Sequence, residues 1–209
     1  MFKKLLIITT LLISPAFADQ AADKAEFKRL YAEFNDLYAN SEDIEPVIEV
    51  AEKLYVLTPK AYGDTSNHYA VVIFNLAKLY DEKGRSFENE FEIKASKLYK
   101  EYFKIQDKRK VPKDKEYLNQ YITYVNTLVN VEGYEIKTND INKIITISEK
   151  LNLTKFEHAS SIYFAATMFF GTGRNAKSKK YFKNALEIYE QELDPDHIRI
   201  AEVLFWLGK

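Results

Sequence analysis

A glycine-rich stretch at residues 171–178 is the part of this sequence closest to a known chemical motif. It reads Gly-Thr-Gly-Arg-Asn-Ala-Lys-Ser, and a lysine followed by serine is the pair that contacts phosphate and Mg²⁺ in a phosphate-binding loop. That motif requires glycine where Ala176 stands and follows a strand, whereas the residues before Gly171 have a helical pattern. We therefore predict no nucleotide site, and nothing else in the sequence indicates a cofactor.

Histidines and carboxylates could bind metals or transfer protons, but their spacing favours neither. His68, His158 and His197 each stand just ahead of, or at the start of, a predicted helix, and no two are three or four residues apart. The acidic side chains at 88–92 alternate without a second group to separate their acidities. The chain has no cysteine, which excludes thiolate metal sites, cysteine nucleophiles and disulfides. We predict no catalytic residue, no metal site and no enzymatic activity.

The charge balance argues against a nucleic-acid partner. Lys and Arg number 30 against 31 Asp and Glu, a net charge of −1, and the two signs are interspersed along the chain. A nucleic-acid binder normally concentrates positive charge on one face to displace counterions. We therefore predict that the protein does not bind nucleic acid.

The first residues have the layout of a secretory signal peptide. Lys3 and Lys4 precede a short apolar run, and Ala16-Phe17-Ala18 presents small residues at the two positions that signal peptidase recognises. We predict a signal peptide at 1–18, cleavage before Asp19, and a mature protein in a bacterial periplasm. No later stretch is apolar and long enough to span a membrane.

Apolar residues recur at spacings of three and four through most of the chain, which predicts helices. The clearest pair is a helix at 156–170, a turn at 171–173 and a second helix at 176–191, with a glycine of the turn in the left-handed conformation. Asp196 is available to cap the next helix. Because the 14% aromatic content follows the helical spacing, we interpret it as packing between helices.

This helical pattern is repeated along the sequence. Shifts of 89, 49 and 131 residues align the helix from Ala70 to Tyr80 with later segments, and a backward shift of 42 aligns it with an earlier one. The unit therefore recurs about every forty residues, which indicates a repeat array. Each unit reads as a helix, a turn and a second helix.

The best-preserved unit resembles the tetratricopeptide repeat (TPR) family. Its large, small, aromatic and turn residues follow the family's order: Ile162, Ala165, Ala166, Phe169, Gly173, Ser178, Phe182 and Ala185. Pro59 is similar to the family's repeat-ending proline, and the connectors at 60–64 and 193–197 resemble the longer kinesin-light-chain variant. The resemblance implies an all-α fold: a repeat domain at 19–209 with about four helix pairs plus the first helix of a fifth. The pairs would stack as a right-handed superhelix (α-solenoid).

Such a stack is expected to leave a concave wall formed by the first helix of each pair. By helical register we predict nine groove residues that bind a partner or extended peptide. They are Arg29, Asp36, Lys78, Asp81, Gln120, Thr127, Asn130, Tyr163 and Thr167.

The last residues, 201–209, begin a first helix without its second helix. We expect Leu204, Phe205, Trp206 and Leu207 to have little cover. A homodimer through this end, or a continuation of the chain beyond it, would provide that cover.

The favoured function is an exported protein–protein interaction scaffold. The opening unit, with Tyr31, Phe34 and Tyr38, resembles exported TPR proteins that carry a TonB-like energy-transducing domain, which implies that this chain is the repeat part of such a protein. The alternatives are an accessory factor of an envelope enzyme or assembly complex, and a hydrolase with an unrecognised site.

Overall fold

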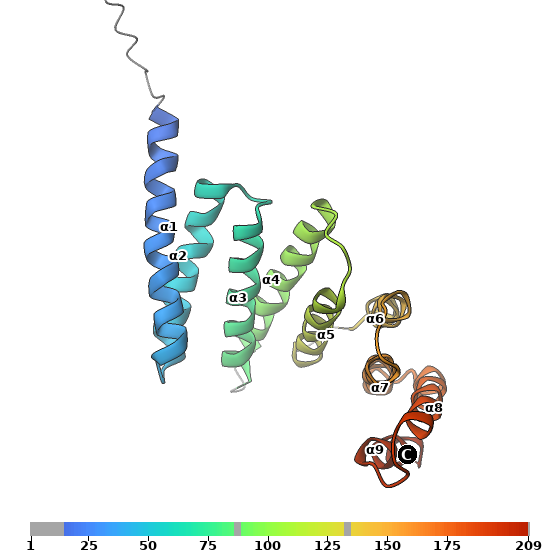
Figure 1. Cartoon of the computed structure of the whole chain (residues 1–209). Helices are drawn as coiled ribbons and strands as arrows, with labels where there is room; N and C mark the ends of the chain where they lie inside the picture. The colour runs from blue at the N-terminus through green and yellow to red at the C-terminus, as the bar shows by residue number, and fades with distance from the viewer. Residues whose placement is uncertain (1–14, 86–88, 132–134, 209) are drawn as a thin grey trace, which may run out of the picture. The chain divides into compact units, whose positions relative to one another are not determined.

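The computed structural model describes residues 15–85, 89–131 and 135–208, and within these ranges the chain forms nine helices and no strand (Figure 1). The helices are α1 (Pro15–Asn40), α2 (Ile44–Tyr62), α3 (Asn67–Gly84), α4 (Asn89–Lys108), α5 (Lys115–Asn130), α6 (Thr138–Lys150), α7 (Lys155–Gly171), α8 (Asn175–Glu192) and α9 (Ile198–Gly208). The all-α prediction is confirmed. The chain divides into two compact units, of which one ends at Tyr80 and the other begins at Asp81.

The predicted signal peptide lies mainly outside the described residues. Helix α1 begins at Pro15, and proline is tolerated at a first helical position because its missing N–H would have no partner there. Cleavage before Asp19 stays a prediction. None of the described helices combines the length and apolar character needed to cross a membrane.

In the first unit, α1 packs against α2 through a shared apolar face. Phe27, Leu30 and Phe34 of α1 are buried, as are Ala51 and Leu54 of α2. Burying a side chain of this size stabilises the fold by about 1.5–3 kcal/mol. These residues recur at spacings of three and four, as the sequence predicted.

Both ends of α2 are fixed by local sequence. The Asp43 side chain accepts a hydrogen bond from the backbone N–H of Glu45 (3.0 Å) and so caps the first turn. Pro59 was expected to end the repeat, but it lies inside α2, which continues to Tyr62. Gly63, at φ 92°, ends the helix instead, and its N–H donates to the carbonyl of Pro59 (2.9 Å).

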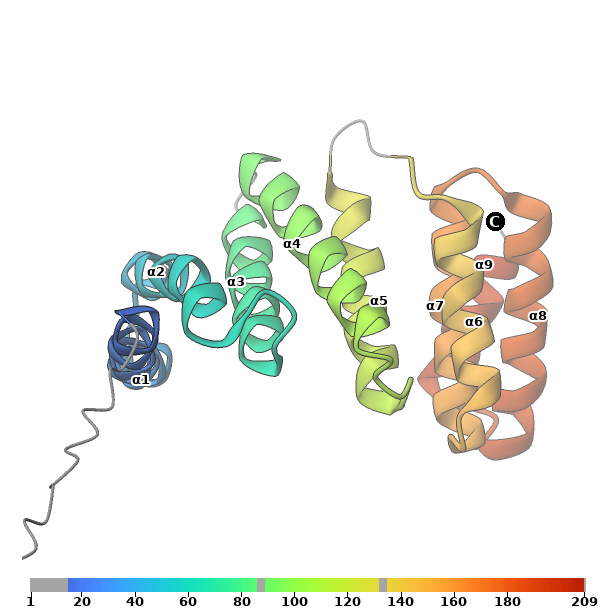
Figure 2. The same cartoon turned by 90° about the horizontal axis from the view of Figure 1, so that it is seen from above.

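In the second unit each helix packs on the next, from α4 through α9 (Figure 2). The predicted pair at 156–170 and 176–191 corresponds to α7 and α8, and Gly173 in the turn has φ 71°. Ser178 donates to the carbonyl of Ala166 (3.0 Å), a close approach that its small side chain permits. One apolar cluster joins α7, α8 and α9: Ala159, Ile162, Ala166, Phe182, Ala185, Tyr189, Ile200 and Val203.

Aromatic side chains pack α4 against α5, as their spacing predicted. The Phe103 ring of α4 lies 5.3 Å from Tyr117, 5.1 Å from Tyr121 and 5.6 Å from Tyr124, measured between ring centroids. The Lys143 ammonium of α6 lies 4.4 Å from the Tyr121 ring centroid, a cation–π contact that ties α6 to α5.

Helix α9 is covered in part. Leu204 and Phe205 are exposed (52% and 59%), as expected, but Trp206 and Leu207 pack against the cluster of α7 and α8. The expectation of little cover is therefore wrong for Trp206 and Leu207, because α7 and α8 already present an apolar surface to this side of α9. The cap also differs from the prediction, since the backbone N–H of Arg199 donates to Nδ1 of His197 (3.1 Å).

Candidate partner-binding site

The starts of α5 and α7 are fixed by capping residues and joined to each other. Asp114 accepts from the backbone N–H of Tyr117 (2.8 Å) at the start of α5. Thr154 and Glu157 form a reciprocal capping box at the start of α7. Lys115 of α5 then pairs with Glu157 of α7. The sequence thus places two first helices with their N-terminal ends side by side.

A pocket of about 290 Å³ lies between α5 and α7 in the second unit. Its lining combines apolar side chains with a few polar ones. These residues are Lys115, Leu118, Asn119, Ile122, Leu153, Phe156, Glu157, Ser160, Ser161 and Phe164.

The polar groups of this pocket are held by ion pairing and by hydrogen bonds within the chain. The hydrogen bond from Lys115, together with the backbone N–H of Thr154, lowers the pKa of Glu157, so its carboxylate stays ionised and paired. The hydroxyls of Ser160 and Ser161 donate to backbone carbonyls of their own helix (2.8 and 3.0 Å), and the Ser160 hydroxyl also lies 3.1 Å from the Tyr189 hydroxyl. Asn119, which is exposed, offers its side-chain amide at the pocket.

Between α7 and α9, by contrast, large aromatic side chains are in contact. The sequence repeat aligns Phe164 of α7 with Trp206 of α9. Trp206 donates its indole N–H to the Tyr163 hydroxyl (3.0 Å), and its ring lies 5.1 Å from Phe170 between centroids. In α5 the residues aligned with Tyr163 and Phe170 are the smaller Thr123 and Asn130. Neither Thr123 nor Asn130 lines the pocket between α5 and α7, which has Phe156 and Phe164 in its wall, so the two pairs of first helices differ in their aromatic contacts.

The structure places the nine predicted groove residues in different environments. Arg29, Asp36, Lys78 and Asn130 are exposed, while Gln120, Tyr163 and Thr167 are half-buried. Several already have partners within their own unit: Arg29 pairs with Glu26 and Glu33, and the Tyr102 hydroxyl donates to Gln120 (2.6 Å).

For Asp81 and Thr127 the expected exposed groove position is wrong, since both are buried (5% and 0% exposed). The Thr127 hydroxyl donates to Asp81 Oδ1 at 2.7 Å, and Arg85 pairs with Asp81 Oδ2 at 3.2 Å. Two polar residues that satisfy each other can be buried at modest cost, and helical register alone does not reveal such a pair.

The predicted face of α5 is turned by one residue from the face that lines the pocket. The predicted groove residues Gln120 and Thr127 do not line this pocket, whereas Leu118, Asn119 and Ile122 do. One residue corresponds to about 100° around a helix, so this difference selects another side of α5. Leu118 and Ile122, four residues apart, are the apolar pair in the sequence that lies on the pocket side of α5.

The remaining candidates for chemistry lie at helix starts and turns. His68 and His158 are in the first turns of α3 and α7, and His197 directly precedes α9, as predicted. The stretch at 171–178, which partly matches a phosphate-binding loop in sequence, connects two helices, α7 and α8. In the part of the chain that the structure describes, no three His, Asp or Glu side chains are grouped to hold a metal ion.

Comparison with known proteins identifies the fold. No protein-family model and no curated protein matches the sequence. Among solved structures, the chain is similar to a putative kinesin light chain of Podosopora anserina with nearly identical TPR-like repeats (TM-score 0.66, 12% identity, 88% of this chain and 85% of that one). It is also similar to BtubC (BKLC) of P. vanneervenii (TM-score 0.55, 13% identity, 93% and 82%). The chain therefore has the TPR-like helical repeat fold.

Proposed function

We propose that this protein is an interaction scaffold that holds a segment of a partner protein between α5 and α7. The observation that carries the proposal is the pocket of about 290 Å³ between these two first helices, with apolar walls and the exposed amide of Asn119. Apolar walls take an apolar side chain, and an amide can donate to and accept from a peptide backbone.

The pocket fits part of a longer partner better than a free small molecule. Small-molecule sites usually have about 300–1,000 Å³ and enclose most of their ligand, and this pocket lies at the lower limit. Lys115 and Glu157 neutralise each other, so neither charge selects a free ionic ligand. One bulky apolar side chain of a peptide can lie against the apolar walls while the peptide backbone hydrogen-bonds to the Asn119 amide.

A peptide-display selection with occluding variants tests the proposal. Asn119→Trp places an indole over the pocket, whereas Asn184→Trp makes the same change at an exposed position of α8 that does not line it. We expect a random peptide library to yield sequences with a fixed apolar residue on the wild-type protein and on Asn184→Trp. Asn119→Trp should weaken their binding at least tenfold, about 1.4 kcal/mol. Equal binding to all three proteins, at unchanged circular dichroism, would contradict this site.

We also propose that the scaffold works in the periplasm, which the leader at 1–18 supports. A role as the repeat part of a TonB-like transducer rests on the resemblance of the opening unit alone. Reading the genomic DNA beyond Lys209 tests that role, because a TonB-like domain in the same frame would support it and an immediate stop codon would remove it.

A further inference from the structure

Helix α9 has an exposed apolar face next to the face that packs on α8. Leu204 and Phe205 are 52% and 59% exposed, and the small residues Ala201 and Gly208, one turn before and one turn after them, are exposed as well. The spacings of three and four place these four residues, the α9 stripe, on one side of the helix. The packed side of α9 is a different one, because it includes the fully buried Val203.

The order of side-chain sizes in the α9 stripe is small, large, large, small. The same order, with the same spacing, occurs on the two faces through which α7 and α8 pack on each other. On α7 these residues are Ala159, Ile162, Tyr163 and Ala166, and on α8 they are Ser178, Tyr181, Phe182 and Ala185. The sequence repeat aligns the α7 set with the α9 stripe residue by residue. The face of α9 that is exposed is therefore the one that α8 covers on α7.

The contacts between α7 and α8 show how this order of sizes is used. At one end the small residues approach closely, since the Ser178 hydroxyl donates to the carbonyl of Ala166 (3.0 Å). In the middle the ring of Tyr163 lies 5.7 Å from the ring of Phe182, measured between centroids. At the other end Ala159 is fully buried in the same cluster. The two helices thus run antiparallel, with small residues at both ends of the contact and large ones between them.

We propose that two copies of this chain pair through the α9 stripe, with the two α9 helices antiparallel. The order small, large, large, small is the same in both directions, so one α9 can take the part of α7 and the other the part of α8. With a two-fold axis between Leu204 and Phe205, Leu204 of each copy lies opposite Phe205 of the other copy. Ala201 then lies opposite Gly208, about 5 Å from the axis along the helix, and these small residues let the two backbones approach.

Self-complementarity selects a second copy over an unrelated helix, since a two-fold interface presents the same patch on both sides. The α9 stripe carries no charge, and the two charged residues within α9, Arg199 and Glu202, pair with each other (2.8 Å). Added salt should therefore not weaken the dimer. The stripe is small, so the dimer belongs to the weak class that buries less than about 1,200 Å² in total. The stripe lies outside the α5–α7 pocket, so the pairing does not depend on the proposed function.

Two charged variants test the pairing by sedimentation equilibrium of the full chain. Leu204→Glu and Phe205→Lys each place a charge opposite an apolar side chain, and both positions are exposed, so the fold should persist and circular dichroism should be unchanged. We expect each variant alone to dimerise at least tenfold more weakly than the wild type. An equimolar mixture should associate more tightly than either variant alone, because the introduced carboxylate and ammonium meet across the axis and the native contact remains on the other side.

Ala201→Trp separates a specific pairing from general apolar adhesion. The indole adds apolar surface but keeps the two helices apart, so we expect dimerisation at least tenfold weaker than in the wild type. Val129→Lys is the control, since Val129 on α5 is similarly exposed (51%) and lies outside the stripe, and it should leave association unchanged.

Five results would each overturn the proposal. They are a wild-type chain that stays monomeric up to roughly millimolar concentration, single charged variants that associate like the wild type, a mixture that associates no more tightly than its components, stronger association of Ala201→Trp, and loss of association in Val129→Lys.

Discussion

At the residue scale, the buried carboxylates at the start of the second unit differ in how they are satisfied. Asp81 accepts from Thr127 and pairs with Arg85. Glu92 is also buried, at 9% exposed, and within the described residues its carboxyl makes no hydrogen bond or ion pair. Burial, and then the nearby negative charge of Asp81, raise the pKa of Glu92 above its usual value. Ionised Glu92 therefore opposes folding.

We predict that Glu92→Gln stabilises the protein near neutral pH by up to about 1 kcal/mol, because glutamine removes this charge. Because the pKa of Glu92 is raised in the folded protein, ionisation of this carboxyl lowers the stability of the fold. The wild type loses stability as pH rises from the ordinary carboxyl value through the raised value of Glu92, and the glutamine variant does not. The gain should therefore disappear below about pH 4, where the carboxyl is protonated in both states. Urea unfolding followed by circular dichroism measures it.

Glu82→Gln is the matched control for Glu92→Gln. Glu82 lies on α3 next to Asp81 in the chain but is exposed. Its substitution should therefore change stability by less than about 0.5 kcal/mol at any pH. A Glu92→Gln variant that is less stable than the wild type at neutral pH would show that the carboxylate is favourably solvated after all.

At the element scale, the turn between α7 and α8 separates two effects of glycine. Gly173 has φ 71°, in the left-handed region, whereas Gly171 is the last residue of α7. A Cβ at either position would meet no atom within 4 Å. The two sites therefore differ in backbone conformation and not in the space available to a Cβ.

We predict that Gly173→Ala destabilises the protein by about 1–2 kcal/mol, since an L-residue pays that cost in the left-handed conformation. Gly171→Ala should be neutral or stabilise by up to about 1 kcal/mol, because alanine favours the helix. Trp206, the single tryptophan of the chain, packs on the neighbouring α8, so its fluorescence during urea unfolding reports both variants. Equal effects of the two substitutions would show that the turn does not hold Gly173 in this conformation.

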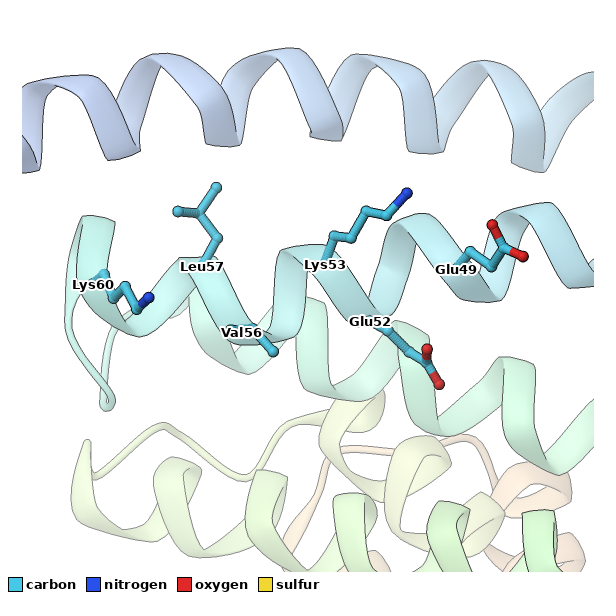
Figure 3. A pocket seen from close by; sticks show the side chains of 6 residues that line it. All are labelled: Glu49, Glu52, Lys53, Val56, Leu57 and Lys60. Carbon is cyan, nitrogen blue, oxygen red and sulfur yellow. The ribbon is translucent and has the colours of Figure 1, made fainter.

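At the scale of the whole molecule, the repeat fold determines which surfaces are available to partners. Successive helices shield each other's apolar faces, which leaves surfaces of individual helices for partners. Two such surfaces, one in each compact unit, are the α5–α7 pocket and the hollow on α2 at Glu49, Lys53 and Lys60 (Figure 3).

Export is the prediction that belongs to this scale. When the full sequence is expressed in a bacterium, we expect the periplasmic fraction to hold a chain that begins at Asp19, because signal peptidase recognises the small residues Ala16 and Ala18. Intact-mass measurement of the purified protein checks the cleavage site. A full-length chain confined to the cytoplasm would contradict export.

Much of the architecture follows from the sequence. The helical period, a left-handed glycine in the turn at 171–173 and the pairing of α7 with α8 were all predicted, because each depends on residues close together in the chain, and the structure places the left-handed glycine at Gly173. Gly84 shows where such reasoning stops. It aligns with Gly173 in the repeat, but its φ is not positive, and a Cβ there would lie 2.6 Å from Cγ of Glu92. One glycine is required for conformation and the other for space.

By itself, the sequence determined an all-helical repeat protein whose units recur at a regular spacing, with no evident catalytic or metal-binding motif. Only the tertiary structure decided which side of each helix is open. The Thr127 hydroxyl donates to Asp81, 46 residues away in the chain, and becomes buried, and Trp206 of α9 donates to Tyr163 of α7. The helical period and the turn residues depend on residues close together in the chain. The exposure of a side chain depends on the rotation of about 100° per residue around its helix and on the side chains that other helices contribute.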